Sequence, residues 1–183
     1  MRGELGDGYT ETLRSVYSEV PETSDYVMYW WHRAAELVRS RQVRRFGFIT
    51  TNSLTQTFQR RVVAAHLNDP SKPASLVFAI PDHPWVNSYD GASVRIAMTV
   101  AEAGSRDGRL LRVESEEPGE EEGASKVEFA ERFGLIHADL TIGPNTTAAI
   151  PLQANKGLSC PGVKLHGAWI HCQPGESART RSG

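Results

Sequence analysis

The sequence predicts an α/β fold with parallel central strands and an antiparallel edge strand. A near-continuous apolar run over Phe46–Thr50 is typical of a strand buried on both faces, and Leu76–Ile80 is a second such run. Residues 93–100 alternate apolar and polar side chains, which predicts a third strand. Because the Asp90-Gly91 turn separates the second and third strands, we expect them to form an antiparallel hairpin at the sheet edge.

Two helices are predicted around these strands. The first runs from a cap at Ser24 or Asp25 to about Ser40 and packs on one face of the sheet. Its apolar stripe recurs at steps of three and four: Val27, Trp30, Trp31, Ala34, Leu37 and Val38. At this spacing we interpret the aromatic residues as core rather than as a base-stacking surface. The second helix covers about Thr55 to Leu67. A shorter helix precedes these two helices within residues 1–21.

Polar segments follow both buried strands. Thr51, Asn52 and Ser53 come directly after the first strand, where α/β enzymes bind small ligands. These side chains can cap the following helix or contact a nucleotide backbone. The second strand is broken by Pro81-Asp82-His83-Pro84, which places Trp85 in a loop. Asp82 and His83 are a weak acid-base pair because neighbours on an extended chain point in opposite directions.

The chain changes character after residue 104. Short β segments are predicted over 110–114 and 126–130, with a further one over 135–140. Seven glutamates lie between Glu114 and Glu128, and with Pro118, Gly119 and Gly123 they predict a solvated, flexible loop. Residues 150–183 show little periodicity, and we expect the tail from Pro174 to be disordered.

Composition narrows the function further. The formal net charge is −2, so bulk charge does not indicate a nucleic-acid binder. Seven arginines between Arg33 and Arg61, against one acid, suit either phosphate contacts or a solvated helix face. Cys160 and Cys172 lack the spacing of a zinc site or a disulfide framework. There is no membrane-length apolar run and no signal-peptide pattern, which predicts a cytoplasmic protein.

The order of these segments resembles the second half of an S-adenosylmethionine-dependent DNA methyltransferase. The resemblance rests on FGFITTNSLTQ, LVFAIPDHPWV and GASVRIAMTV, taken in that order, and on the helix DYVMYWWHRAAELVR. It covers about residues 1–170 and is closest to N6-adenine enzymes of restriction-modification systems, including fused restriction-methylation polypeptides. The fold implied is the second half of a Rossmann-like class I methyltransferase sheet, followed by short β segments.

The resemblance also implies a division of the chain. Residues 1–104 correspond to part of the methyltransferase catalytic domain, and 105–149 to a β-rich extension with an acidic loop. Residues 150–183, with GVKLHGA, correspond to the start of the target-recognition region and a disordered tail.

One departure from the family decides what the chain can do alone. The family's Asn/Asp-Pro-Pro-aromatic catalytic loop is absent, since no two prolines are adjacent, and so is its glycine-rich cofactor loop. Only 45 residues precede Phe46, so we expect a missing N-terminal half. The chain should neither bind S-adenosylmethionine nor transfer a methyl group by itself. We assign it no catalytic, cofactor-binding or metal-binding residue, and whether it is an enzyme stays open.

Site residues follow from the same resemblance. Trp85 matches the aromatic residue that stacks on a flipped adenine, and the alternative is a tryptophan that covers the sheet edge. Asn52, Arg60 and Arg61 are the predicted contacts to double-stranded DNA in the complete enzyme. The alternative function is a non-catalytic module that binds DNA or a partner protein. A hydrolase is disfavoured because no Gly-x-Ser-x-Gly elbow is present.

Overall fold

The structure is a computed structural model that describes residues 2–87, 93–118, 125–144 and 153. The chain divides into two compact units, Met1–Ala148 and Ala149–Gly183. Only Gln153 of the second unit lies within the described residues, so the fold below is that of the first unit. The predictions for the Asp90-Gly91 turn, Cys160 and Cys172, GVKLHGA and the tail lie outside the described residues.

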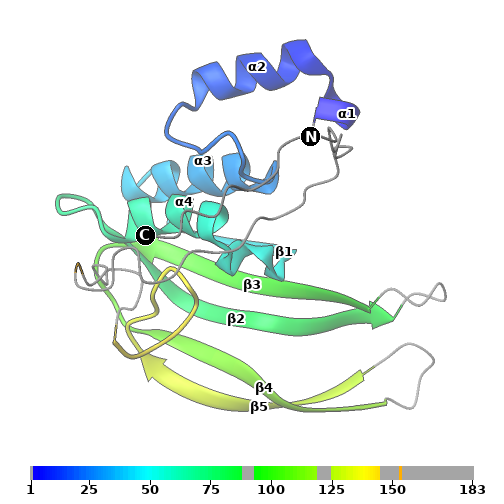
Figure 1. The fold of residues 1–183 in the computed structure, drawn as a ribbon. Helices are drawn as coiled ribbons and strands as arrows, with labels where there is room; N and C mark the ends of the chain where they lie inside the picture. The colour runs from blue at the N-terminus through cyan, green and yellow to red at the C-terminus, as the bar shows by residue number, and fades with distance from the viewer. Residues whose placement is uncertain (1, 88–92, 119–124, 145–152, 154–183) are drawn as a thin grey trace, which may run out of the picture. The chain divides into compact units, whose positions relative to one another are not determined.

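Among the described elements, three helices precede the first strand, two helical segments follow it, and the remaining four strands come in succession (Figure 1). The helices are α1 (Arg2–Leu5), α2 (Asp7–Val16), α3 (Val27–Arg39), the 3-10 helix η1 (Asn52–Thr55) and α4 (Thr57–Leu67). The strands are β1 (Arg45–Thr51), β2 (Ala74–Asn87), β3 (Ser93–Ala103), β4 (Gly108–Pro118) and β5 (Ser125–Gly134). The fold is therefore mixed α/β, as predicted.

The five strands form one sheet in the order β1-β3-β2-β4-β5. β3 is antiparallel to both β1 and β2, and the single parallel pair among the described strands is β2 with β4. The prediction that β3 is antiparallel is confirmed, but the prediction that it is an edge strand is wrong. β1 and β2 run in the same direction without being neighbours, because β3 turns back between them and satisfies hydrogen-bonding groups on both of its sides.

β1 is an edge strand and is not buried on both faces as predicted. Phe46, Phe48 and Thr50 turn towards the helices, and the Phe46 ring lies 5.2 Å from the Trp31 ring, centroid to centroid. Ile49 on the other face is 56% exposed. The apolar run located the strand correctly but did not reveal that helices cover one face only.

β2 is longer than predicted and contains the segment that was expected to break it. Its pairing with β3 shifts register between Ile80 and His83 and again between Pro84 and Asn87. Such irregularities accommodate a proline, which has no backbone N–H to donate to the ladder. Trp85 is consequently a strand residue rather than a loop residue.

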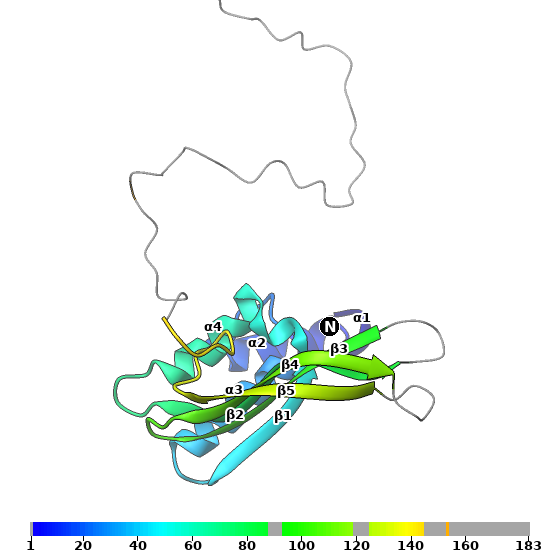
Figure 2. The ribbon, with the colours of Figure 1, turned by 90° about the horizontal axis from the view of Figure 1, so that it is seen from below.

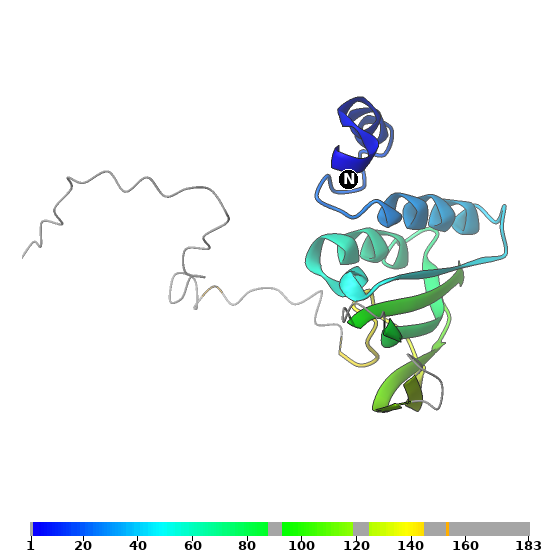
Figure 3. The same ribbon diagram turned by 90° about the vertical axis from the view of Figure 1, so that its right-hand side faces the viewer.

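Helices α3 and α4 cover one face of β1, β2 and β3 (Figure 3). The fully buried side chains of α3 are Met28, Trp31, Ala35 and Val38. The predicted stripe is therefore partly wrong, because Trp30 is 55% exposed. Two overlapping stripes satisfy the helical period, and the one chosen by the fold contains His32, a polar residue that hydrophobicity alone does not select.

His32 is buried because it meets a second histidine from α4. Nε2 of His66 lies 3.0 Å from Nδ1 of His32, and Nδ1 of His66 lies 3.0 Å from Nη1 of Arg39. Arginine only donates, so Nδ1 of His66 accepts and its Nε2–H donates to His32. Burial, followed by the charges of His32 and Arg39, lowers the pKa of His66 to about 4. Burial also lowers the pKa of His32.

The start of α4 differs from the predicted cap. Residues 52–55 form η1, and the N-cap position belongs to Gln56, which makes no side-chain capping hydrogen bond. Ser53 Oγ instead donates to Asp25 Oδ2 at 2.9 Å, so neither residue caps a helix. The helix-capping alternative for the Thr51-Asn52-Ser53 turn is thus wrong.

β4 and β5 form an antiparallel hairpin that contains both predicted β segments, and Figure 2 shows it beside β2 with the helices behind. Four of the glutamates expected in a loop lie on these strands: Glu114, Glu116, Glu117 and Glu128. The strand predicted over 135–140 is wrong; Ile136 makes only isolated bridges to Leu76 and Ile142.

Gly108 joins the hairpin to the rest of the sheet. A Cβ at this position would lie 2.1 Å from the Leu76 carbonyl oxygen and 2.8 Å from Cδ1 of Ile136. The parallel contact between β2 and β4 therefore requires a residue without a side chain. In the part of the chain that the structure describes, no helix is both long and apolar enough to cross a membrane.

Candidate functional site

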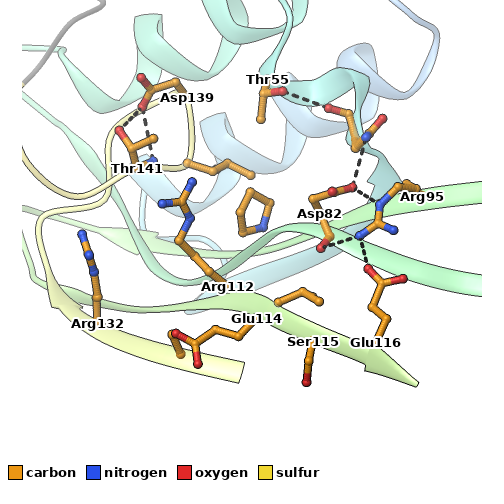
Figure 4. A pocket seen from close by; sticks show the side chains of 15 residues that line it. Thr55, Asp82, Arg95, Arg112, Glu114, Ser115, Glu116, Arg132, Asp139 and Thr141 are labelled. Atoms are coloured by element: carbon orange, nitrogen blue, oxygen red, sulfur yellow. Dashed lines mark hydrogen bonds and ion pairs between the residues drawn. The ribbon is translucent and has the colours of Figure 1, made fainter. Parts of the chain in front are cut away.

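A polar cavity of about 980 Å³ opens where β1 ends, beside the middle of β2 and the start of β3 (Figure 4). The hairpin and residues 139–141 supply its other walls. The polar side chains that matter most are Asn52, Asp82, Arg95, Glu116, Arg112 and Arg132. These residues come from five elements, η1 and the four strands β2 to β5, so the cavity exists only once the sheet has formed.

A chain of polar contacts crosses one side of the cavity. Asn52 Nδ2 donates to Asp82 Oδ1 at 3.2 Å, and Arg95 Nε donates to the same oxygen at 2.5 Å. Arg95 Nη2 also donates to Glu116 Oε1 at 2.7 Å. The hydrogen bonds that Arg95 donates to Glu116 and Asp82 raise the pKa of its guanidinium, which therefore stays charged. Arg95 thus links β2, β3 and β4 at the cavity wall.

The turn after β1 aims Asn52 into this chain of contacts. Thr55 Oγ1 donates to the Asn52 carbonyl at 3.0 Å, which closes the 3-10 turn. Thr51 Oγ and Ser53 Oγ lie 2.6 Å apart, so the hydroxyls of the turn bond to each other. The side chain of Asn52 is left to reach β2. The polar turn that the sequence singled out after the first strand thus lies at the cavity wall, and its contact with a nucleotide stays a prediction.

The structure separates the four predicted site residues. Asn52 lines the cavity, whereas Arg60, Arg61 and Trp85 are not among the described residues that do so. Arg60 is half-buried on α4, and the Arg61 guanidinium lies 5.4 Å from the centre of the Phe58 ring. Trp85 is 47% exposed on β2. Their proposed roles on DNA remain predictions.

Asp82 and His83 diverge, as expected for neighbours on an extended strand. Asp82 is held by Asn52 and Arg95, while His83 stacks on Phe129 with ring centres 5.7 Å apart. His83 Nδ1 lies 2.5 Å from the Pro84 carbonyl oxygen. The two side chains therefore do not form an acid-base pair.

Sequence reasoning missed Arg95, Glu116, Arg112 and Arg132. Arg95 meets Asp82 across thirteen positions and Glu116 across twenty-one, so no local spacing reveals either contact. Arg112 and Arg132 lie on strands whose pairing register was unknown from the sequence. Their one sequence signal is an isolated arginine in an otherwise strand-like segment, which is too common to select them.

The described residues show neither a metal-ligand cluster nor a glycine at the cavity wall. They contain no group of three or more histidine, cysteine, aspartate or glutamate side chains that could hold a metal ion. No glycine of the described chain lines the cavity, so there is no close-approach backbone of the kind that cradles a nucleotide-like cofactor. The carboxylates of Asp82 and Glu116 are engaged by Arg95.

A known protein family matches the part of the chain that contains the helix-covered strands. The profile of the family described as MmeI, DNA-methyltransferase domain, matches residues 7–111. Asn52, Asp82 and Arg95 lie inside this span, whereas Arg112 directly follows it and Arg132 lies further along the chain. No curated protein matches the chain.

A solved structure shares the fold. The Type IIL restriction-modification enzyme MmeI in complex with DNA matches with a TM-score of 0.51 and 21% sequence identity. The match covers 76% of this chain and 18% of the MmeI chain, so the chain spans under a fifth of that enzyme. Because the family profile covers more than half of the sequence, the chain belongs to the family of the MmeI DNA-methyltransferase domain.

Proposed function

We propose that this chain is part of a restriction-modification enzyme that transfers a methyl group from S-adenosylmethionine to N6 of adenine in double-stranded DNA. The observation that carries the proposal is the family match over residues 7–111. The polar cavity supports it, because Asn52 and Asp82 lie where β1 ends and β2 passes, the region where α/β enzymes place their ligands.

The chain is proposed to supply the DNA side of the reaction. An adenine in a duplex is inaccessible until it is rotated out of the stack. In the proposed complex Trp85 stacks on the extruded base, which contributes roughly 1–3 kcal/mol. Arg60 and Arg61 neutralise backbone phosphates, and Asn52 contacts the nucleotide beside the cavity.

The remaining chemistry is assigned to residues outside this sequence. The chain lacks the Asn/Asp-Pro-Pro-aromatic loop and the glycine-rich loop. We therefore propose that it is the second half of a Rossmann-like catalytic domain, and that a separate segment or chain provides the first half. No methyl-transfer step is assigned to a residue of this chain.

Calorimetry of the purified chain with S-adenosylmethionine tests this division. We expect no measurable binding, because the described residues offer no cofactor cradle. Joining the chain to a family segment that carries both missing loops should restore binding and methylation of adenine. Micromolar binding to the chain alone would refute the half-domain proposal. Sequence-independent DNA binding without methylation in the joined protein would instead favour the non-catalytic module.

Trp85 is tested in the same joined protein. Trp85→Phe should keep most of the activity because an aromatic face remains. Trp85→Ala should lower the methylation rate about five- to hundredfold, with S-adenosylmethionine affinity unchanged. Fluorescence of 2-aminopurine at the target position reports base flipping directly. If Trp85→Ala changes neither the rate nor the fluorescence, Trp85 only covers the sheet.

A further inference from the structure

We propose that Arg112 of β4 and Arg132 of β5 form a second DNA-contact site, which grips backbone phosphate from the hairpin wall of the cavity. The inference rests on the proposed DNA function but names residues beyond the matched span of 7–111. Both arginines line the cavity.

The register of the hairpin brings the two side chains to one face. Arg112 is opposite Ala130, and Arg132 is opposite Leu110. The two arginines are therefore diagonal neighbours across the two strands. Long side chains at such positions are close enough to contact the same ligand. The irregularity of the hairpin lies beyond them, between Val113 and Ser115, so it does not disturb this arrangement.

The two guanidinium groups differ from the other arginines of the sheet in having no anion to bind. Among the described residues, Arg95 is paired with Asp82 and Glu116, and Arg109 with Glu131. Arg112 and Arg132 have neither an ion pair nor a hydrogen bond with any described residue. Both side chains are exposed, so a ligand can reach them.

The carboxylates around the cavity do not compensate this charge. Asp82 and Glu116 are held by Arg95, and Asp139 Oδ1 accepts from Thr141 Oγ1 at 2.7 Å. Figure 4 shows Glu114 pointing away from the side on which the Arg112 and Arg132 side chains rise. The hairpin wall thus presents two adjacent positive groups on rigid strands.

Paired guanidinium groups suit a phosphodiester. Each guanidinium offers five N–H donors in a planar fork that matches phosphate oxygens. Backbone phosphates are the anions that duplex DNA presents repeatedly and independently of sequence. The pair therefore fits a role in positioning the duplex rather than in reading its bases.

Fluorescence anisotropy of the full chain with a labelled duplex tests the site over a range of salt concentrations. Arg112→Ala with Arg132→Ala should weaken binding at low salt by roughly tenfold or more. The slope of log K against log salt should become shallower by about 1.8, since each phosphate contact contributes about 0.9. Replacing both arginines by lysine should preserve most of the slope.

Arg109→Ala is the matched control. Arg109 lies on the same strand, but its side chain is on the other face of the sheet and is paired with Glu131. It should change affinity less than twofold. Equal slopes for the double alanine variant and this control would overturn the site, as would absence of duplex binding by the wild-type chain. If inorganic phosphate displaces the labelled duplex as well as unlabelled duplex does at equal concentration, the ligand is free phosphate and the DNA assignment fails.

The failure of this site and that of the proposed function are distinguishable. Adenine methylation by the joined protein measures the function without reference to Arg112 or Arg132. Should the double alanine variant lose its circular dichroism signal, the lysine variants and Arg109→Ala decide the question by their slopes.

Discussion

The helix-covered strands β1–β3 and the hairpin β4–β5 are built on different principles. Leu76, Ala97 and Ala101 of β2 and β3 are completely buried beneath α3 and α4. On β4 and β5, Leu110 is the one buried hydrophobic side chain of the described part, and Phe133 is 73% exposed. The hairpin is held by its ladder of strand pairing, and exposed cross-strand ion pairs such as that of Arg109 with Glu131 add little.

The family profile matches the helix-covered region and little of the hairpin. The matched span stops at residue 111, four residues into β4. A buried core restricts every side chain that it contains, whereas a two-stranded ladder leaves its side chains free to vary. The helix-covered region therefore carries most of the buried core, whereas the described hairpin carries mainly exposed side chains.

The two tryptophans of α3 give the largest expected contrast. Trp31 is completely buried and Trp30 is mostly exposed. Trp31→Ala should lower the free energy of unfolding by about 3–5 kcal/mol, because it opens a cavity in the core. Trp30→Ala should cost under about 1 kcal/mol. Urea unfolding followed by circular dichroism measures both, and equal losses would contradict a core centred on Trp31.

Gly108 tests whether the two regions fold as one unit. Gly108→Ala forces a Cβ against the Leu76 carbonyl, so we expect a loss of about 3 kcal/mol or separation of the hairpin. Gly8→Ala is the control, since a Cβ there meets nothing within 4 Å and alanine favours a helix. Hydrogen exchange shows which strands lose protection. Unchanged protection on β4 would mean that the seam tolerates a side chain.

Acid should weaken the helix-covered region selectively. The folded-state pKa of His66 is about 4, below its ordinary 6.5, so the unfolded chain binds the proton first as the pH falls. The free energy of unfolding should therefore decrease between about pH 6.5 and 4, by up to about 3 kcal/mol. The charge of Asp69 raises the pKa of His66, but by less than burial lowers it. His66→Gln should flatten the pH profile; a profile identical to that of the wild type would exclude His66 as the cause.

The smallest effect is expected for the exposed ion pair of the hairpin. Arg109→Ala should lower the free energy of unfolding by under about 1 kcal/mol, because solvent screens the Arg109–Glu131 pair. The loss should shrink further at high salt. Thermal unfolding at two salt concentrations checks this, and a larger or salt-independent loss would show that the hairpin relies on this pair for its fold.

Local patterns in the sequence located most elements but not their neighbours. The strands near Phe46 and Leu76 were predicted from short apolar runs. Both hairpin strands were predicted as short β segments. The position of β3 between β1 and β2 was not predicted, because strand order depends on contacts between residues far apart in the chain. The exposure of Ile49 was not predicted for the same reason.

The site was predicted less completely than the fold. Asn52 was singled out because a polar turn after an apolar strand is a local signal; it lines the cavity, and its contact with DNA stays a prediction. Arg95 acts through Asp82 and Glu116, which lie on other strands, so its role appears only when the register is known. Trp85 was expected in a loop because prolines usually end strands, whereas β2 absorbs Pro84 at an irregularity in its pairing.

The edge position of β1 has a consequence for how copies of the chain behave in concentrated solution. An open strand edge invites another strand to pair with it, and Ile49 adds an apolar surface there. Arg44 and Arg45 stand at the entrance to this strand, and both are exposed. Positive charge at a strand edge makes approaching copies repel each other. Because Arg45 is paired with Glu102, it is the charge of Arg44 that should disfavour edge-to-edge association.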